Sequence, residues 1–127
     1  MVELALMLPM LLTLMLGVVD LGMGFRTYIT LTNAAREGAR WMTIHPSDPS
    51  GALARVTVEA DRAGLSNTGS PTGGIQVVFT PNQSTYIAGQ DVTVTIRHDY
   101  PLMFGLITAL PNVPFRTETT MVVLYTD

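Results

Sequence analysis

Four side chains of the kind used in hydrolytic catalysis occur as near neighbours along the chain: His45 with Ser47, and His98 with Asp99. A nucleophilic triad needs side chains that converge in space, whereas adjacent residues on a strand, such as His98 and Asp99, point to opposite faces. The sequence also lacks a nucleophile elbow, a phosphate-binding loop, a dinucleotide-binding glycine pattern and an HExxH motif. Both histidines are therefore expected to be surface or hydrogen-bonded residues, and we expect no enzymatic activity, metal or cofactor.

Two carboxylates in an apolar segment are the other chemically notable residues. Residues 4–19 carry no charge, and the apolar character continues past Asp20 to Phe25. Because roughly 20 apolar residues span a bilayer as a helix, this segment is long enough to enter a membrane. Glu3 heads the segment and Asp20 lies near its far end. A carboxylate in hydrocarbon is costly, so both are functional candidates.

The charges around this segment differ from those of an ordinary membrane anchor. The first basic residue is Arg26, and Arg36 and Arg40 follow, all after the apolar run. Taken literally, the positive-inside rule would place roughly the last hundred residues in the cytoplasm. Removal of a basic leader ahead of Met1 would explain the same pattern, and an uncleaved start at Met1 is a further alternative.

The overall composition limits the remaining functions. The 127 residues are 13% charged with a formal net charge of −3, so the sequence has no electrostatic footprint for nucleic-acid binding. There is no cysteine, which excludes disulfides and thiolate metal sites. Once a spanning helix is set aside, about 85 residues remain, enough for one small domain with a modest core. Packing or assembly must then stabilise it.

The helix that contains the apolar run is expected to continue well beyond it. Helical spacing of apolar residues is kept at Tyr28, Leu31, Ala35, Ala39 and Met42. The pattern predicts one helix from Glu3 to about Ile44, roughly 63 Å long at 1.5 Å per residue. About half of it would project beyond a ~30 Å hydrocarbon layer. His45 precedes Pro46, and this pair ends the helix.

A short second helix and a small sheet are expected after it. Residues 51–65 favour a helix capped by Ser47 or Ser50, ended by Gly64, with one face formed by Leu53, Val56, Ala60 and Ala63. Strand patterns cover residues 74–80, 91–99 and 115–126, and the apolar residues 101–114 between the last two favour a short helix or a loop. The expected fold class is α+β, with a long N-terminal apolar helix, a short second helix and an antiparallel sheet of about three strands. The chain is expected to divide into the N-terminal membrane or filament-core helix, residues 1–45, and a small α+β domain, residues 46–127.

Three motifs within about the first 40 residues carry a family resemblance: VELALMLP, GVVDLG and TNAAREGAR. They resemble the N-terminal signature of the TadE-like pseudopilins of tight-adherence pili, which are relatives of type IV pilins. The rest of the chain is similar in element order. The resemblance implies a secreted bacterial subunit that is held in the inner membrane, cleaved by a prepilin peptidase, and built by the pilus assembly machinery into a homopolymer through its apolar helix.

The resemblance suggests a role for Glu3. In a fibre core made of many such helices, the Glu3 carboxylate would meet a free α-amine, either that of a neighbouring copy's Met1 or that of its own Met1. The dielectric constant in the core is low, so a well-formed ion pair there is stronger than the same pair at a surface. Removal of the leader would supply that amine. The alternative is a solvated acid at the level of the lipid headgroups, favoured by the dipole at the helix N-terminus.

Asp20 and Pro9 raise separate questions in the same helix. One expectation is that Asp20 is solvated at the membrane edge or bonded to a nearby threonine or backbone group. The other is that it pairs with Arg26 or with an arginine of an adjacent subunit. Pro9 removes a helix hydrogen bond and clashes with the preceding turn, so a kink or unwound stretch is expected between Ala5 and Pro9.

The NAAREGAR motif predicts a close contact on the helix surface. Its small residues recur four apart, a pattern that lets another backbone approach: Ala34 with Gly38, and Ala35 with Ala39. Arg36, Glu37 and Arg40 would lie at the rim or against a neighbouring subunit. The contact is expected with the globular domain or a neighbouring helix. The alternative is an Ala-rich helix favoured by propensity alone.

Two functions remain open. One is a structural subunit of an extracellular pilus-like filament at the cell surface, polymerising through its apolar helix after export and leader cleavage. The other is a minor, membrane-held pseudopilin that acts in pilus assembly or at the tip. A membrane enzyme or receptor is a third class, and the sequence contains no site for it.

Overall fold

The computed structural model describes residues 2–62, 64–65, 74–103, 105 and 112–125, with side chains from Leu6 onward. The fold is α+β, as predicted. Its helices are α1 (Val2–Ile44) and α2 (Pro49–Asp61), and its strands are β1 (Ile75–Thr80), β2 (Asp91–Pro101) and β3 (Asn112–Val122). The three strands form one antiparallel sheet in the order β1-β2-β3.

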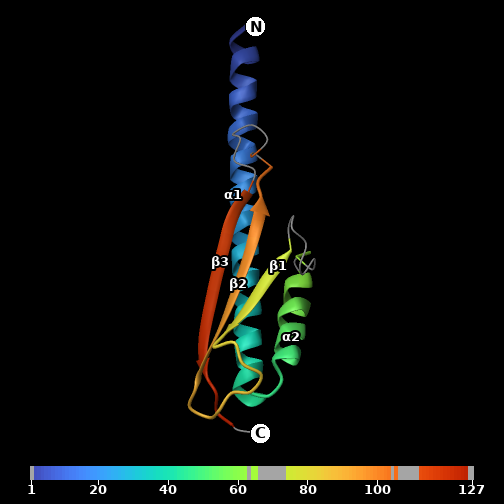
Figure 1. Ribbon diagram of the computed structural model, residues 1–127. Helices are drawn as coiled ribbons and strands as arrows, with labels where there is room; N and C mark the ends of the chain where they lie inside the picture. The colour runs from blue at the N-terminus through green and yellow to red at the C-terminus, as the bar shows by residue number, and fades with distance from the viewer. Residues whose placement is uncertain (1, 63, 66–73, 104, 106–111, 126–127) are drawn as a thin grey trace.

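Helix α1 has two parts with different surroundings (Figure 1). Its C-terminal half lies behind the sheet and beside α2, while its N-terminal half projects beyond them. The buried residues of α1 in the core are Leu31, Ala34, Ala35, Ala39 and Met42, which confirms the predicted stripe except at Tyr28, whose side chain is exposed. The C-terminal half has a single apolar stripe, which the sheet and α2 can cover from one side. The N-terminal half is apolar all round, so it needs apolar surroundings on every side.

The unwound stretch expected between Ala5 and Pro9 is not present, so that part of the prediction was wrong, while a kink there stays a prediction. Helix α1 is continuous over 43 residues with Pro9 inside it. The hydroxyl of Thr13 donates to the Pro9 carbonyl at 2.8 Å, one turn further along. The helix therefore continues through Pro9 despite the N–H that the proline lacks.

The sheet packs one face of β2 into the core. Val92, Val94 and Ile96 alternate along the strand and are buried, as the strict period of two predicts. Opposite Ile96 lie Val77 of β1 and Thr117 of β3. β2 is thus the central strand, and its apolar face meets the stripe of α1.

Strand β3 begins and ends earlier than predicted. It starts at Asn112 and includes Pro114, which an edge strand tolerates because one side of its backbone has no strand to bond. It ends at Val122 because the next two amides bond elsewhere: Val123 N–H to Gln90 O at 2.9 Å and Leu124 N–H to Thr43 O at 2.9 Å. The C-terminal segment therefore ties the end of α1 to the β1–β2 connection.

Helix α2 is capped by Asp48 and not by either predicted serine. The Asp48 carboxylate accepts from the Gly51 amide at 2.9 Å and from the Ser50 hydroxyl at 2.6 Å. These two hydrogen bonds hold the pKa of Asp48 below its ordinary value, and the one from Ser50 has the larger effect. Trp41 of α1 donates to the other carboxylate oxygen at 3.4 Å, so the cap also fixes α2 against α1.

The buried face of α2 differs from the predicted one by part of a turn. It consists of Ala52, Val56 and Ala60, while Leu53 is 38% exposed. Small residues therefore face α1, which lets the two helices lie close together. Ala63, which the sequence placed on this face, lies outside the described residues.

Gly38 lies at the closest point of this contact. A Cβ atom added there would lie 2.5 Å from Val56 Cγ2 and 3.7 Å from both the Ala52 carbonyl oxygen and Val94 Cγ1. The globular part of the chain thus rests on the small-residue stripe of NAAREGAR, which is one of the two contacts expected from the sequence. Glycine is needed at this position because Val56 is buried and its branched side chain has little freedom to move.

Replacing Gly38 by leucine is expected to lower the free energy of unfolding by roughly 1–3 kcal/mol, because the contact with Val56 and Val94 becomes overpacked. Thermal unfolding in detergent, followed by circular dichroism, measures the change. Gly22→Leu is the matched control, since a Cβ at Gly22 meets nothing within 4 Å. Equal melting of the two variants would show that the contact yields without cost.

Candidate assembly surface

The side chains considered for catalysis do not come together. His98 is buried on the core face of β2, with its Nδ1 3.4 Å from the Gly74 carbonyl oxygen, while Asp99 is exposed. His45 stacks on the Trp41 ring at a centroid distance of 4.0 Å, and the described part of the chain offers its buried Nδ1 no hydrogen-bond partner. Ring stacking therefore holds His45, which is half-buried and so partly at the surface, as predicted. Among the described residues, no group of three acidic, histidine or cysteine side chains could hold a metal ion. The absence of enzymatic activity stays a prediction.

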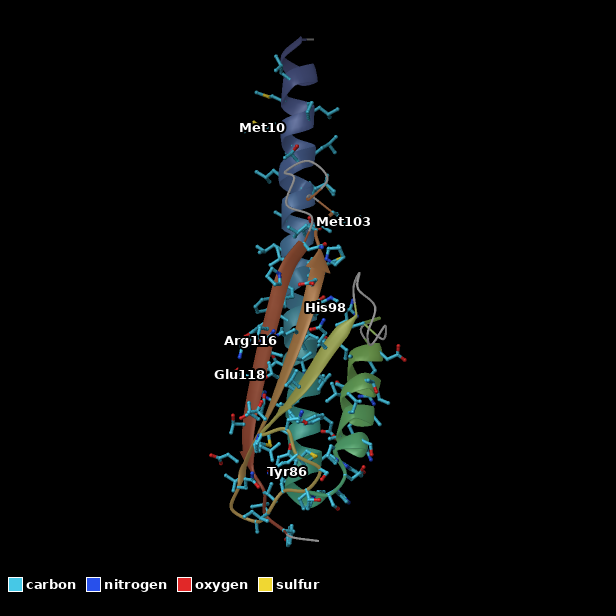
Figure 2. The ribbon with its side chains drawn as sticks, in the orientation of Figure 1. Met10, Tyr86, His98, Met103, Arg116 and Glu118 are labelled. Atoms are coloured by element: carbon cyan, nitrogen blue, oxygen red, sulfur yellow. The ribbon has the colours of Figure 1, made fainter. Side chains whose placement is uncertain are left out.

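The segment from Leu6 to Val19, called the stem below, is the largest uncovered apolar surface. Its outward side chains include Leu6 at 74% exposure and Met10 at 75%. Figure 2 shows Met10 well beyond the ends of the strands. In the part of the chain that the structure describes, α1 is the one helix long and apolar enough to cross a membrane. The stem therefore needs either lipid or protein around it.

The residues predicted to act at the head of the stem are only partly described. The backbone of Glu3 belongs to the first turn of α1, and its side chain lies outside the described residues. Met1 lies outside them altogether. The pairing of Glu3 with an α-amine stays a prediction.

Asp20 is bonded to a backbone group, one of the predicted alternatives. Its side chain is 4% exposed, and its Oδ1 accepts from the Met103 amide at 3.1 Å. The negative charge of Asp20 adds to burial in raising the pKa of Tyr100, on the neighbouring end of β2. Arg26, one of the predicted partners, is exposed. Asp20 thus holds the segment that follows β2 against α1.

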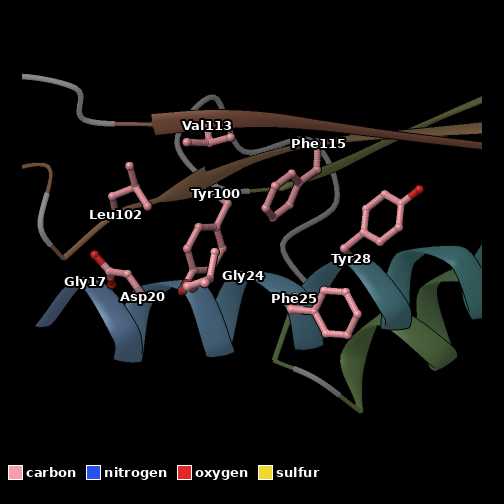
Figure 3. Close-up of a pocket in the computed structure, with 10 residues that line it drawn as sticks. Gly17, Asp20, Gly24, Phe25, Tyr28, Tyr100, Leu102, Val113 and Phe115 are labelled. Carbon is pink, nitrogen blue, oxygen red and sulfur yellow. The ribbon is translucent and has the colours of Figure 1, made fainter. Parts of the chain in front are cut away.

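A groove lies beside Asp20, between α1 and the adjoining ends of β2 and β3 (Figure 3). Its volume is about 400 Å³. The Phe115 ring stacks on Tyr100 at a centroid distance of 5.6 Å and meets Tyr28 edge-on at 6.2 Å. The lining is almost entirely apolar and consists of Gly17, Asp20, Leu21, Gly24, Phe25, Tyr28, Tyr100, Leu102, Val113 and Phe115. This groove was not among the features predicted from the sequence, although Gly17 and Gly24, two turns apart on one helix face, are a signal that could have indicated it.

The charged residues of NAAREGAR surround the buried stripe. Arg36 and Arg40 are exposed and Glu37 is half-buried, while the four small residues between and beside them are buried. With neighbouring side chains they line a second, polar hollow, formed by Asn33, Arg36, Glu37, Arg40, Glu59 and Met121. They therefore lie at the rim of the contact, where a neighbouring subunit could reach them.

The stem, the Asp20 contact and the stripe all fall within one segment that can be compared with known families. Residues 1–40 match the family model described as TadE-like protein. The TadE-like segment thus contains the whole N-terminal part of α1 and the surface on which the sheet rests, while α2 and the three strands lie outside it. Neither the curated proteins nor the solved structures that were searched gave a match.

Replacing Asp20 by alanine is expected to speed hydrogen exchange at the Met103 amide and to lower the free energy of unfolding by roughly 1–3 kcal/mol, because a buried acceptor is lost. Hydrogen–deuterium exchange resolved to short peptides measures the first effect. Asp20→Asn keeps a carbonyl oxygen at the same place and should retain most of the protection. Unchanged exchange in the alanine variant would contradict the role of Asp20 as the anchor of this segment.

Proposed function

We propose that this protein is a structural subunit of a tight-adherence pilus-like filament, which polymerises through α1 after export and leader cleavage. The observation that carries the proposal is the bare stem, in which nearly every residue from Leu6 to Val19 is exposed. The match of the TadE-like segment supports the pilus context. The subunit would be inserted in the inner membrane before assembly, processed by a prepilin peptidase, and displayed at the cell surface afterwards.

The energetics favour assembly through the stem over assembly through surface charges. Each fully buried Leu, Met or Val is worth ~1.5–3 kcal/mol relative to exposure. Surface ion pairs, such as Arg116 with Glu118 on β3, are worth ~0–1 kcal/mol each. Partial burial of the stem in a bundle of copies would therefore exceed the contribution of all such pairs, and the arginines would set register more than strength.

A minor, membrane-held pseudopilin that acts in assembly or at the tip is the alternative. The same bare stem supports it, because lipid covers an apolar helix as completely as neighbouring helices do. The two functions differ in what surrounds the stem in the mature protein, and this can be measured.

Purified material is expected to form filaments that survive 1 M NaCl and dissociate in mild detergent, because apolar packing is insensitive to salt and detergent competes for the stem. The measurement is the amount of pelletable filament after each treatment, with untreated filament as the control. Filaments that survive detergent and dissociate in salt would show that the outer domains carry the assembly. Detergent-held monomers with no filaments under any condition would support the membrane-held alternative.

Replacing Glu3 by alanine is expected to reduce filament yield sharply while the sheet domain stays folded, because the α-amine of the neighbouring copy loses its partner. Glu3→Gln, which keeps the shape and removes the charge, should behave in the same way. Glu118→Ala, a change at an exposed acid of β3, is the control and should assemble normally. Normal yield from both Glu3 variants would exclude the pairing.

A further inference from the structure

We propose that the groove beside Asp20 binds the stem of a second copy of this chain, so that the stem of each subunit enters the groove of the next. This inference rests on the proposed function and names the surface that receives the stem. It is carried by the shape and chemistry of the groove and by its position on α1.

The floor of the groove is open at the point where another helix would approach. A Cβ atom added at Gly17 meets nothing within 4 Å. Gly24 is buried, and a Cβ atom added there would already contact the Phe115 and Tyr100 rings, at 3.5 Å and 3.8 Å, so the open part of the floor lies at Gly17. Small residues on a helix face let a second backbone come close, and the seven-residue spacing places Gly17 and Gly24 on the same face. The walls beside them are aromatic rings (Figure 3).

The chemistry of the groove selects an uncharged occupant. The one acidic side chain in the lining, Asp20, is held by the Met103 amide. The rest of the lining is glycine, aliphatic or aromatic. The stem is an uncharged apolar helix that none of the described residues covers. Gly17 to Tyr28 extends over roughly 16 Å of α1, so about three turns of a second stem could lie along the groove with the side chains of one face inside it.

A subunit cannot fill its own groove with its own stem. The two surfaces lie along one continuous helix, α1, and the groove begins at Gly17, in the last turn of the stem. The contact must therefore join two copies. Because the stem of each copy is proposed to enter the groove of the next copy and not that of a reciprocal partner, the contact is heterologous. A heterologous contact that does not close into a ring repeats as an open helical filament.

The sharpest test adds the same side chain at two glycines of α1. Gly17→Leu fills the floor of the groove, while Gly22→Leu adds equal apolar surface at a residue outside the groove lining, and both glycines have open space in the single subunit. We expect Gly17→Leu to reduce pelletable filament at least tenfold and Gly22→Leu to leave it near the unmodified level, with equal melting of the two sheet domains. Equal yields from the two variants, both high or both low, would overturn the proposal.

Cross-linking gives a second, independent test, because the chain has no cysteine of its own. Two differently tagged copies are combined, one carrying Val113→Cys in the groove and the other Leu12→Cys or Met15→Cys in the stem. Mild oxidation should yield a dimer that bears both tags, whereas Val78→Cys, an exposed residue on β1 outside the groove lining, should not form one with the same stem variants.

The two tests separate failure of this inference from failure of the proposed function. Filaments that form without the mixed dimer, and equally from both glycine variants, would keep the function and overturn the groove contact. If the protein stays in membranes and forms no filaments, a mixed dimer would support the groove contact but not the proposed function. Its absence there as well would overturn the groove contact.

Discussion

The close approach of α2 and β2 to α1 at Gly38 is the contact on which the rest of the fold depends. Val56 and Val94 reach the helix from two different elements at this one position. Because α1 offers only alanine and glycine there, the second helix and the sheet can share one narrow stripe of its surface. The apolar faces of both elements are thereby buried by a chain with a small core.

The same helix carries two surfaces with opposite requirements. Near Gly38 its stripe is one-sided and is covered within the chain, whereas the stem is apolar all round and is covered by nothing that the structure describes. The change occurs near Asp20, the buried acid that bonds the segment after β2. A single charged residue therefore marks the boundary between the part of α1 that stabilises the monomer and the part left for lipid or other copies.

Local patterns predicted the elements well and their contacts poorly. The stripe from Leu31 to Met42 and the alternation from Val92 to Ile96 indicated α1 and β2 correctly, because each reports a periodic environment along one element. The start of β3 was missed because Pro114 is acceptable only on an edge strand, and the strand order is a property of the whole sheet. The hydrogen bond from Met103 to Asp20 joins residues 83 positions apart, and no local pattern encodes such a contact. The groove was missed because Gly17 and Gly24 mark only its helix side, while its other walls come from β2 and β3.

The direction of the strands relative to α1 has a mechanical consequence. β2 and β3 run nearly along the helix (Figure 1), with eleven paired positions between them. Hydrogen bonds of an antiparallel pair are perpendicular to the strands, so a pull along the helix axis loads many of them at once in shear. A pull across the axis would instead open them one after another. If α1 lies along the length of a fibre, the sheet is oriented to resist traction on that fibre, and unfolding under load would need the whole ladder between β2 and β3 to slip together.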